Sequence, residues 1–436
     1  MSTHANEERM NVNERWRWLA VMAVCVLSRL AGGQTRPATL PASAQAMRAD
    51  LRVLAEELPR RHVNAFTKVS RQRFDEEVER LCDDAAGLTL DQFHVRLLQL
   101  VALIGDGHTT LAWGDAQTDF GRLPMSIVRL KDGYFINATD PAHRALLGGK
   151  LVRVGDVDID EAAARVATLF PYENDASLHN GVCWWLGVPE ALEVLGIVPS
   201  RERVPLHVQT REGNDVSTTF APAARGEAMT FVVMPTQDML KSPRLVNPRP
   251  QFYWFEHVPE HQAVYVRYDK CANDPTKILL LFSKELFEFL DGHAADVRRV
   301  IIDLRRNGGG NSLVFAPVIA GLAARERFTR DGNLIVLIGP RTFSSGMMNA
   351  LQLKQHARAV LMGRPTGQKP NSFGEVKSFA LPNLGATVNY STKRFTQIDG
   401  DDPPSLMPDV LVEPTADDYF AGRDVALERA LEFARP

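Results

Sequence analysis

The carboxy-terminal part of the chain alternates between short apolar runs and segments of helical period. Buried strands and intervening helices are expected there, in chain order, at residues 263–268, 278–290, 300–304, 312–324, 334–338, 347–355 and 359–362. Strands and helices that alternate at such short intervals favour a parallel sheet covered by helices. Residues 250–436 are therefore predicted to form an α/β core.

The part of the chain before this core has two different patterns. Apolar residues recur at three- and four-residue spacing over residues 47–112, which predicts an N-terminal helical region. Short strand-like runs follow over residues 113–240, and residues 148–159 contain two strands around a Gly-Asp turn. A β domain is expected there, so the chain as a whole is predicted to have a mixed α/β fold.

The first residues are typical of an export signal. A basic aromatic stretch precedes an unbroken apolar run at residues 19–27, which is far shorter than the ~20 residues of a membrane-spanning helix. Residues 1–33 are predicted to be a signal peptide or an N-terminal anchor, and residues 34–46 a linker rich in Pro, Ala, Thr and Ser. We therefore expect an exported protein, periplasmic or extracellular, with membrane anchoring through an uncleaved segment as the alternative.

Composition excludes several classes of function. Lys plus Arg is 50 and Asp plus Glu is 53, so the net charge of −3 leaves no basic excess for nucleic-acid binding. No further apolar run suggests an integral membrane bundle. The four cysteines are scattered, which argues against a disulfide scaffold or a cysteine zinc site. The sequence does not indicate an oligomeric state.

One local pattern resembles a metal site. His257-Val258-Pro259-Glu260-His261 matches the inverted zinc-peptidase pattern His-x-x-Glu-His. That chemistry needs both imidazoles on one face of a helix, whereas Pro259 disrupts a helix and the flanking residues have a strand pattern. No metal and no organic cofactor are therefore expected.

Three short segments carry candidate chemistry. Residues 105–109, Gly-Asp-Gly-His-Thr, form a turn that contains His108. Residues 303–310 follow a buried strand and end in three glycines, which let backbone N–H groups approach a ligand as an oxyanion hole requires. Residues 339–346 place two serines before a helix, whose dipole favours developing negative charge. Helix capping or a tight turn would explain each segment alone, but their occurrence together favours catalysis.

Together these segments resemble the S41 family of serine peptidases, the C-terminal-processing and tricorn-core proteases, over about residues 50–436. Asp303-Leu304-Arg305-Arg306-Asn307-Gly308-Gly309-Gly310 is similar to the family's Asp-Leu-Arg-x-Asn-x-Gly-Gly. Thr342-Phe343-Ser344-Ser345-Gly346 looks like its nucleophile turn. Gly363-Arg364-Pro365-Thr366-Gly367 is similar to its Gly-x-x-Thr segment, and Pro408-Asp409-Val410 to its closing Pro-Asp-Val.

The resemblance implies a ClpP/crotonase-like core over residues 250–436 with an N-terminal helical region and a PDZ-like β domain over 113–240. Residues 148–159 look like the carboxylate-binding turn of that PDZ-like domain. The resemblance also implies Ser344 as the nucleophile. The backbone N–H groups of Ser345 and Gly309 would form the oxyanion hole, with Gly310 as the alternative to Gly309. Many family members carry Glu three residues after the serine, but this chain has Met347.

The resemblance leaves two candidates for the base. Lys369 stands 25 residues after Ser344, at the position of the lysine base in the C-terminal-processing branch. A lysine base must be neutral and therefore buried. His108 matches the histidine turn of the tricorn-like branch, and an imidazole needs no large pKa shift to act as a base. We favour His108. Asp402, six residues before Pro408, would be its orienting acid.

The orienting acid has two alternatives to Asp402, namely Asp399 and Glu375.

The function predicted is a serine-type endopeptidase that cleaves peptides or unfolded proteins by acyl transfer through Ser344. Met347 and the unusual surroundings of Lys369 motivate an alternative, a catalytically inactive S41-like protein that binds peptides. A crotonase-like acyl-CoA enzyme is a weaker alternative, since no adenine-site signature is readable.

Overall fold

The computed structural model describes residues 43–113, 120–223, 228–236, 239–240 and 250–433. The predicted signal peptide at 1–33 and most of the predicted linker lie outside these residues. Helix α2 (Ala44–Arg61), the first within the described residues, begins inside the segment 34–46 that composition assigned to the linker. Ser43 caps this helix, because its hydroxyl accepts a hydrogen bond from the N–H of Ala46 at 3.2 Å.

The α/β core predicted for the carboxy-terminal part is built around a six-stranded sheet in the order β16-β13-β12-β11-β10-β9. Its strands are β9 (Tyr253–Val258), β10 (Ala263–Tyr268), β11 (Arg299–Asp303), β12 (Leu334–Ile338), β13 (Val360–Gly363) and β16 (Val410–Leu411). All neighbours are parallel except β9, which is antiparallel to β10. The carboxyl ends of the parallel strands therefore meet at one edge, where ligands bind in open α/β sheets.

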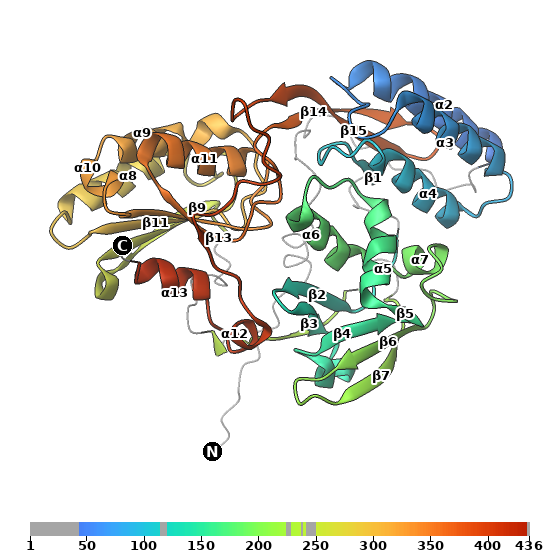
Figure 1. Ribbon diagram of the computed structural model, residues 1–436, viewed down its shortest axis with the longest axis horizontal. Coiled ribbons are helices and arrows are strands. Elements are labelled where there is room, and N and C mark those ends of the chain that lie inside the picture. The colour runs from blue at the N-terminus through green and yellow to red at the C-terminus, as the bar shows by residue number, and fades with distance from the viewer. Residues whose placement is uncertain (1–42, 114–119, 224–227, 237–238, 241–249, 434–436) are drawn as a thin grey trace.

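Helices cover both faces of this sheet (Figure 1). On β11, Val300 and Ile302 face one apolar core and Ile301 faces the other, because side chains alternate along a strand. The first core contains residues of three helices: α8 (Leu279–Gly292), α9 (Ala316–Ala323) and α11 (Ser345–Ala357). The other core contains residues of α13 (Val425–Leu431). Both faces of the sheet are thus buried. This explains why its strands are continuous apolar runs, which allowed them to be predicted from the sequence.

A second sheet, entirely antiparallel, occupies the middle of the chain. Its main path is β2 (Met125–Leu130), β3 (Gly133–Thr139), β4 (Lys150–Val154), β6 (Val204–Gln209) and β7 (Asp215–Phe220). Two short strands join it, β5 (Val157–Asp158) on β4 and β8 (Val232–Val233) on β3. The three helices of this region are α5 (Ile159–Val166), α6 (Asp175–Trp185) and α7 (Pro189–Val194). The Gly-Asp turn predicted between two strands is the β4–β5 turn; the PDZ-like character of the region stays a prediction.

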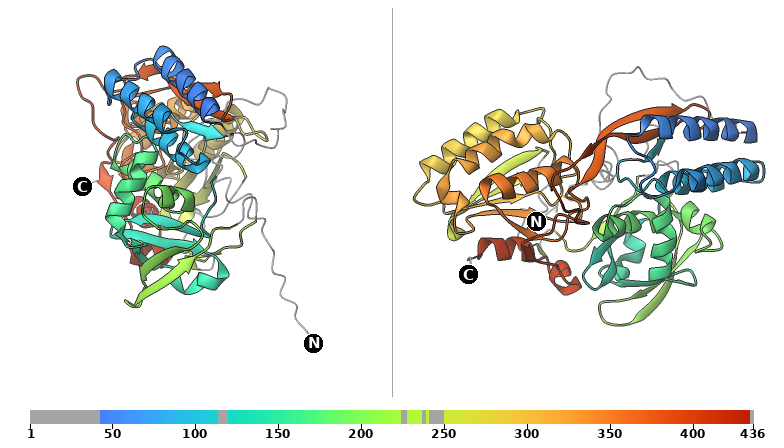
Figure 2. Two further views of the ribbon diagram at one scale, coloured as in Figure 1. Left: turned by 90° about the vertical axis from the view of Figure 1, so that its right-hand side faces the viewer. Right: turned by 45° about the horizontal axis from the view of Figure 1, so that its top comes forward.

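The third sheet joins the N-terminal region to a hairpin of the carboxy-terminal region. The long hairpin of β14 (Ser372–Leu381) and β15 (Ala386–Phe395) extends from the core to the N-terminal helices, as both Figure 1 and Figure 2 show. β1 (Leu111–Trp113) pairs with β15, and α2 packs beside the hairpin with α3 (Arg71–Asp84) and α4 (Leu90–Ala102). The N-terminal helical region is therefore held by a segment more than 250 residues later in the chain.

Helices and several sheets in one chain confirm the predicted mixed α/β fold class. The zinc-peptidase pattern does not lie on a helical face, since His257 is in strand β9 and His261 ends a short 3₁₀ turn, Pro259–His261. Among the helices of the described residues, none combines the length and apolar character that crossing a bilayer requires.

The contact between Asp50 of α2 and the tip of the hairpin offers a test of this long-range packing. Asp50 is completely buried, and its carboxylate accepts hydrogen bonds from Asn383 Nδ2 and from the N–H of Leu384, both at 2.7 Å. We expect Asp50→Ala to lower the free energy of unfolding by about 1–3 kcal/mol, because the buried donors lose their acceptor. Urea unfolding measures this loss. Asp156→Ala, at a fully exposed carboxylate, serves as the control and should unfold as wild type does; equal stability of the two variants would contradict the role of Asp50.

Candidate active site

The turn after α4 is organised by the buried carboxylate of Asp106. Its Oδ2 accepts hydrogen bonds from His62 Nε2 (3.1 Å), Thr109 Oγ1 (2.7 Å) and Ser391 Oγ (2.5 Å). Its Oδ1 accepts the N–H of His108 at 3.1 Å. Burial alone would raise the pKa of Asp106, but the hydrogen bonds of His62 and Ser391 and the proximity of His108 outweigh it and lower the pKa to about 2. Asp106 is therefore a carboxylate at neutral pH and fixes the backbone that carries His108.

Ser344 occupies a strained turn between β12 and α11. Its φ of 50° and ψ of −129° lie outside the regions that non-glycine residues normally adopt, which costs of order 1–3 kcal/mol. Hydrogen bonds hold the turn: Thr342 Oγ1 donates to Leu304 O at 2.9 Å, and Phe343 N–H donates to Asn307 O at 3.0 Å. The Ser344 side chain makes no capping hydrogen bond to α11. Its hydroxyl is thus not used as an ordinary helix cap.

The structure brings His108 and Ser344 together although 236 residues separate them. His108 Nε2 lies 3.1 Å from Ser344 Oγ, which is hydrogen-bonding distance for a base and a nucleophile. His108 is buried, and its ring packs against that of Phe343 with centroids 4.9 Å apart. Burial lowers the pKa of His108, and the charge of Asp106 and a hydrogen bond to the backbone of Phe373 only partly offset it. The imidazole is therefore neutral near pH 7 and able to accept a proton.

The glycine-rich loop after β11 lies directly against Ser344. A Cβ on Gly309 would lie 2.6 Å from Ser344 Cβ, and one on Gly310 would lie 2.3 Å from the carbonyl oxygen of Cys271. Both glycines have φ above +100°, so close approach and backbone conformation together require glycine at these positions.

The same loop shows which backbone donors remain available. Gly309 N–H donates to Asn307 Oδ1 at 2.9 Å, and Ser345 Oγ donates to Gly310 O at 2.7 Å. Within the described part of the chain, the N–H groups of Gly310 and Ser345 have no acceptor. Of the three predicted oxyanion donors, these two are therefore better placed to bind a ligand than Gly309, whose N–H shapes the loop.

The two other predicted catalytic residues do not join this pair. Lys369 Nζ donates to Asp402 Oδ2 at 2.7 Å, and both side chains reach solvent. The ammonium group of Lys369 therefore contacts a carboxylate and not Ser344. Asp402 contacts this lysine rather than His108, and the alternative acids Asp399 and Glu375 are exposed. The family resemblance placed these positions by alignment, and alignment does not show in which direction a loop side chain points.

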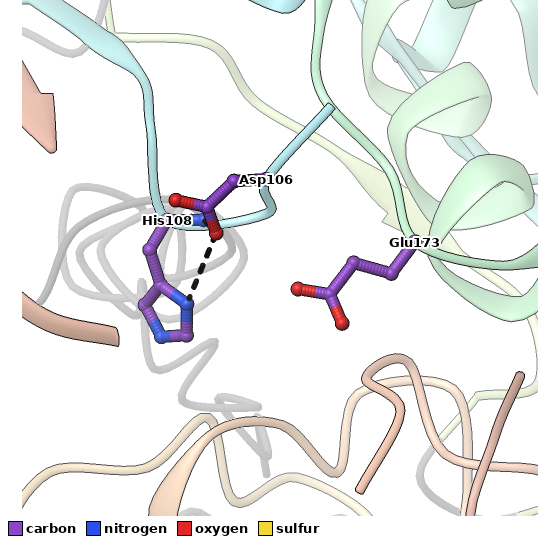
Figure 3. Close-up of side chains that lie close together, drawn as sticks. All are labelled: Asp106, His108 and Glu173. Carbon is purple, nitrogen blue, oxygen red and sulfur yellow. Dashed lines mark hydrogen bonds and ion pairs between the residues drawn. The ribbon is translucent and has the colours of Figure 1, made fainter. Parts of the chain in front are cut away.

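Two further side chains, the buried Gln368 and the partly buried Glu173, complete the arrangement. Gln368 Oε1 accepts the N–H of Ser344 at 2.6 Å, and its Nε2 lies 3.4 Å from His108 Nδ1. The same Nε2 donates to Glu173 Oε1 at 3.4 Å. Figure 3 shows Glu173 pointing toward Asp106 and His108 from a different part of the chain. Gln368 directly precedes Lys369, which the family resemblance had indicated, so the sequence pointed to its neighbourhood. Nothing in the sequence around Glu173 indicates a site.

The side chains of Asp106, His108 and Glu173 offer three possible metal ligands within 4.8 Å of one another. A metal does not fit well, because the NH₂ group of Gln368 lies at hydrogen-bonding distance from two of them. Asp106 also already accepts hydrogen bonds from four donors. The cluster is better described as a hydrogen-bonded network that supports the histidine.

The contact between Gly309 and Ser344 gives a direct test of the loop. We expect Gly309→Ala to reduce hydrolytic turnover by roughly 100-fold or more, because the added methyl group displaces Ser344 and the backbone donors beside it. Steady-state kinetics measures the effect. Gly292→Ala, where a Cβ meets no atom within 4 Å, provides the matched control; similar turnover in both variants would show that the loop does not shape the site.

Comparison with known proteins agrees with the resemblance found in the sequence. Residues 316–412 match the family model described as Peptidase family S41. This segment includes Ser344, Gln368 and the hairpin β14–β15. The match confirms the resemblance and supports a peptidase. Among curated proteins, none matches the chain.

Solved structures share the fold over nearly the whole chain. The structure of mature CPAF complexed with lactacystin is 13% identical, covers 89% of this chain and 98% of its own, and has a TM-score of 0.60. Mature CPAF has the same identity, coverage of 89% and 97%, and the same TM-score. A CPAF mutant is 12% identical, covers 90% and 97%, and has a TM-score of 0.61. At this identity the likeness concerns the fold.

Proposed function

We propose that the chain is a serine-type endopeptidase that cleaves peptides or unfolded proteins with Ser344 as nucleophile and His108 as base. The observation that carries this proposal is the 3.1 Å contact between His108 Nε2 and Ser344 Oγ across 236 residues of sequence. A neutral imidazole, a serine on a strained strand-to-helix turn and nearby backbone donors are the groups that acyl transfer needs.

In the first half of the reaction, His108 Nε2 takes the hydroxyl proton while Ser344 Oγ attacks the peptide carbonyl. This step needs the single N–H proton of the neutral ring on Nδ1, and the proton taken up at Nε2 leaves the ring positively charged. Asp106 is a carboxylate whose Oδ1 lies 3.9 Å from Nδ1, so its charge stabilises the imidazolium. The N–H groups of Ser345 and Gly310 would receive the developing oxyanion, because the N–H of Gly309 already donates to Asn307 Oδ1.

His108 then gives its proton to the amine nitrogen as the C–N bond breaks, so the amine leaves and the acyl group remains on Ser344. Water then repeats the sequence, with His108 again as base, and releases the second product. The peptide itself would bind in extended form along a sheet edge, with its carbonyl group directed at the oxyanion donors. Every step uses groups of the protein and water.

The alternative of an inactive peptide-binding protein rested on Met347 and on the surroundings of Lys369. Met347 is buried in the apolar core beneath α11. Its position is therefore explained by packing, and the carboxylates near His108 come from Asp106 and Glu173 instead. We also propose that the protein acts after export and that the PDZ-like region binds peptide, as the sequence predicts.

The nucleophile is tested by Ser344→Ala. We expect turnover of an unfolded protein substrate to fall by roughly 10⁴- to 10⁶-fold, since the acyl acceptor is removed. Mass spectrometry of the cleavage products measures turnover. Ser312→Ala, at the start of a 3₁₀ turn in the same core, is the control that should cleave as wild type does. Cleavage that survives Ser344→Ala would mean that another residue is the nucleophile, and no cleavage by wild type would favour the peptide-binding alternative.

The base is tested by comparing two alanine variants in the same assay. We expect His108→Ala to abolish turnover and Lys369→Ala to leave it close to wild type, because of these two side chains it is His108 that contacts the Ser344 hydroxyl. Removing the exposed Lys369–Asp402 ion pair costs about 0–1 kcal/mol of stability at most. The reverse result, with activity lost in Lys369→Ala and kept in His108→Ala, would replace the Ser–His pair by a Ser–Lys pair.

A further inference from the structure

Glu173 belongs to the middle region of the chain but contacts loops of both other regions. It lies between the 3₁₀ turn Ala167–Leu169 and helix α6. Its Oε1 accepts the N–H of Gly107 at 3.4 Å, and its Oε2 accepts the N–H of Lys369 at 3.2 Å. These two N–H groups neighbour His108 and Gln368 in sequence. One carboxylate thus connects the histidine turn with the loop that touches Ser344, and Figure 3 shows it directed toward that turn.

The fit around this carboxylate is tight. A Cβ on Gly107 would lie 3.1 Å from Glu173 Oε1 and 3.0 Å from the ring of Phe343. Gln368, only 1% exposed, donates to the same Oε1 while its own Oε1 accepts the N–H of Ser344. A displacement of Glu173 would therefore be transmitted to His108 through Gly107 and to Ser344 through Gln368.

The segment that carries Glu173 is itself docked on the core. Asn174 Nδ2 donates to the carbonyl oxygens of Thr366 (3.0 Å) and Pro404 (2.7 Å). Asn180 Nδ2, one and a half turns further along α6, donates to Pro340 O at 2.8 Å. The start of α6 therefore has a defined position against the loops that follow β12 and β13.

We propose that Glu173 is a positioning residue of the peptidase site, whose carboxylate clamps the His108 turn to the Gln368 loop and makes catalysis depend on docking of the middle region. This inference rests on the proposed function for its effect on turnover. The clamp itself is a property of the hydrogen-bond network and can be measured separately.

The network requires the charged form of Glu173. All three of its hydrogen-bond partners, Gly107, Lys369 and Gln368, are N–H donors, so a protonated carboxyl group would place its O–H against a donor. Burial and then the charge of Asp106 raise the pKa of Glu173 to about 7, against the lowering effect of the three donors.

The other ionisable groups beside Glu173 are those of the histidine turn and of the 366–370 loop. His108 and Asp106 face it from the turn, while Lys369 offers only its backbone because its ammonium group contacts Asp402. As the pH falls through about 7, Glu173 takes up a proton and the clamp loses an acceptor. Turnover should therefore rise with pH through this range.

The test compares Glu173→Gln with wild type and with Glu161→Gln, a control at a half-exposed glutamate of α5. We expect Glu173→Gln to lower kcat by roughly 10- to 100-fold with little change in KM, because the catalytic groups are displaced while the peptide site remains. The acid limb of the kcat profile, near pH 7 in wild type, should move to lower pH, where His108 alone titrates. Glu173→Asp keeps the charge but has a shorter side chain. It should lower kcat and leave the acid limb of the kcat profile near pH 7.

A second measurement does not depend on peptidase activity. The ring signals of His108, assigned in the full chain with ¹⁵N-labelled histidine by comparison with His108→Ala, are followed against pH. In wild type we expect them to report two ionisations, that of His108 and that of Glu173 near pH 7. The second ionisation should disappear in Glu173→Gln and persist in Glu161→Gln.

The two measurements separate the inference from the proposed function. Identical His108 titrations in wild type and Glu173→Gln would overturn the clamp, whatever the activity of the protein. An unchanged kcat profile in an active Glu173→Gln enzyme would overturn it as well. A wild-type protein that cleaves nothing but shows both ionisations of His108 would refute the proposed function and still support the clamp.

Discussion

The arrangement of the whole site depends on the buried carboxylate of Asp106. It joins three segments that are distant in sequence: His62 after α2, Ser391 of β15 and the turn that carries His108. His62 Nδ1 accepts the N–H of Asn64 at 2.9 Å, so its Nε2 carries the proton that it donates to Asp106. An uncompensated charge at this depth would cost several kcal/mol, and the surrounding donors remove that cost. The N-terminal helices and the C-terminal hairpin are thus tied together at the turn that carries His108.

Much of the fold follows from the sequence because its signals are local. Strands β10 and β12 begin and end where the apolar runs 263–268 and 334–338 do, since strands buried on both faces are continuous runs of apolar residues. The contacts that assemble the regions are not local. Nothing in the residues around Asp50 indicates that its carboxylate binds Asn383 and Leu384, because such a contact depends on how a hairpin more than 300 residues away extends from the core.

The same difference explains which parts of the site could be predicted. Ser344, His108 and the glycine loop lie on turns whose residue types have few alternatives: glycines for close approach, a serine before a helix and a histidine between glycines. Asp402 and Lys369 were assigned by their distance along the sequence from better-defined motifs, and in the structure they contact each other. Glu173 was missed because its role depends on the docking of α6, which no sequence pattern in residues 170–180 reveals.

The two carboxylates beside His108 have opposite pKa shifts, and the reason distinguishes their roles. Asp106 is buried and Glu173 partly buried. Asp106 accepts hydrogen bonds from hydroxyl, imidazole and backbone donors at 2.5–3.1 Å, whereas the donors around Glu173 lie at 3.2–3.4 Å. Removal from water raises both pKa values. Around Asp106 the shorter hydrogen bonds and the proximity of His108 outweigh it and lower the pKa to about 2, whereas the charge of Asp106 adds to it at Glu173 and raises that pKa to about 7. Pairs of ionisable groups whose environments separate their pKa values are typical of sites with divided tasks. Here the member with the lowered pKa comes from the same turn as the histidine, and the member with the raised pKa comes from the middle region.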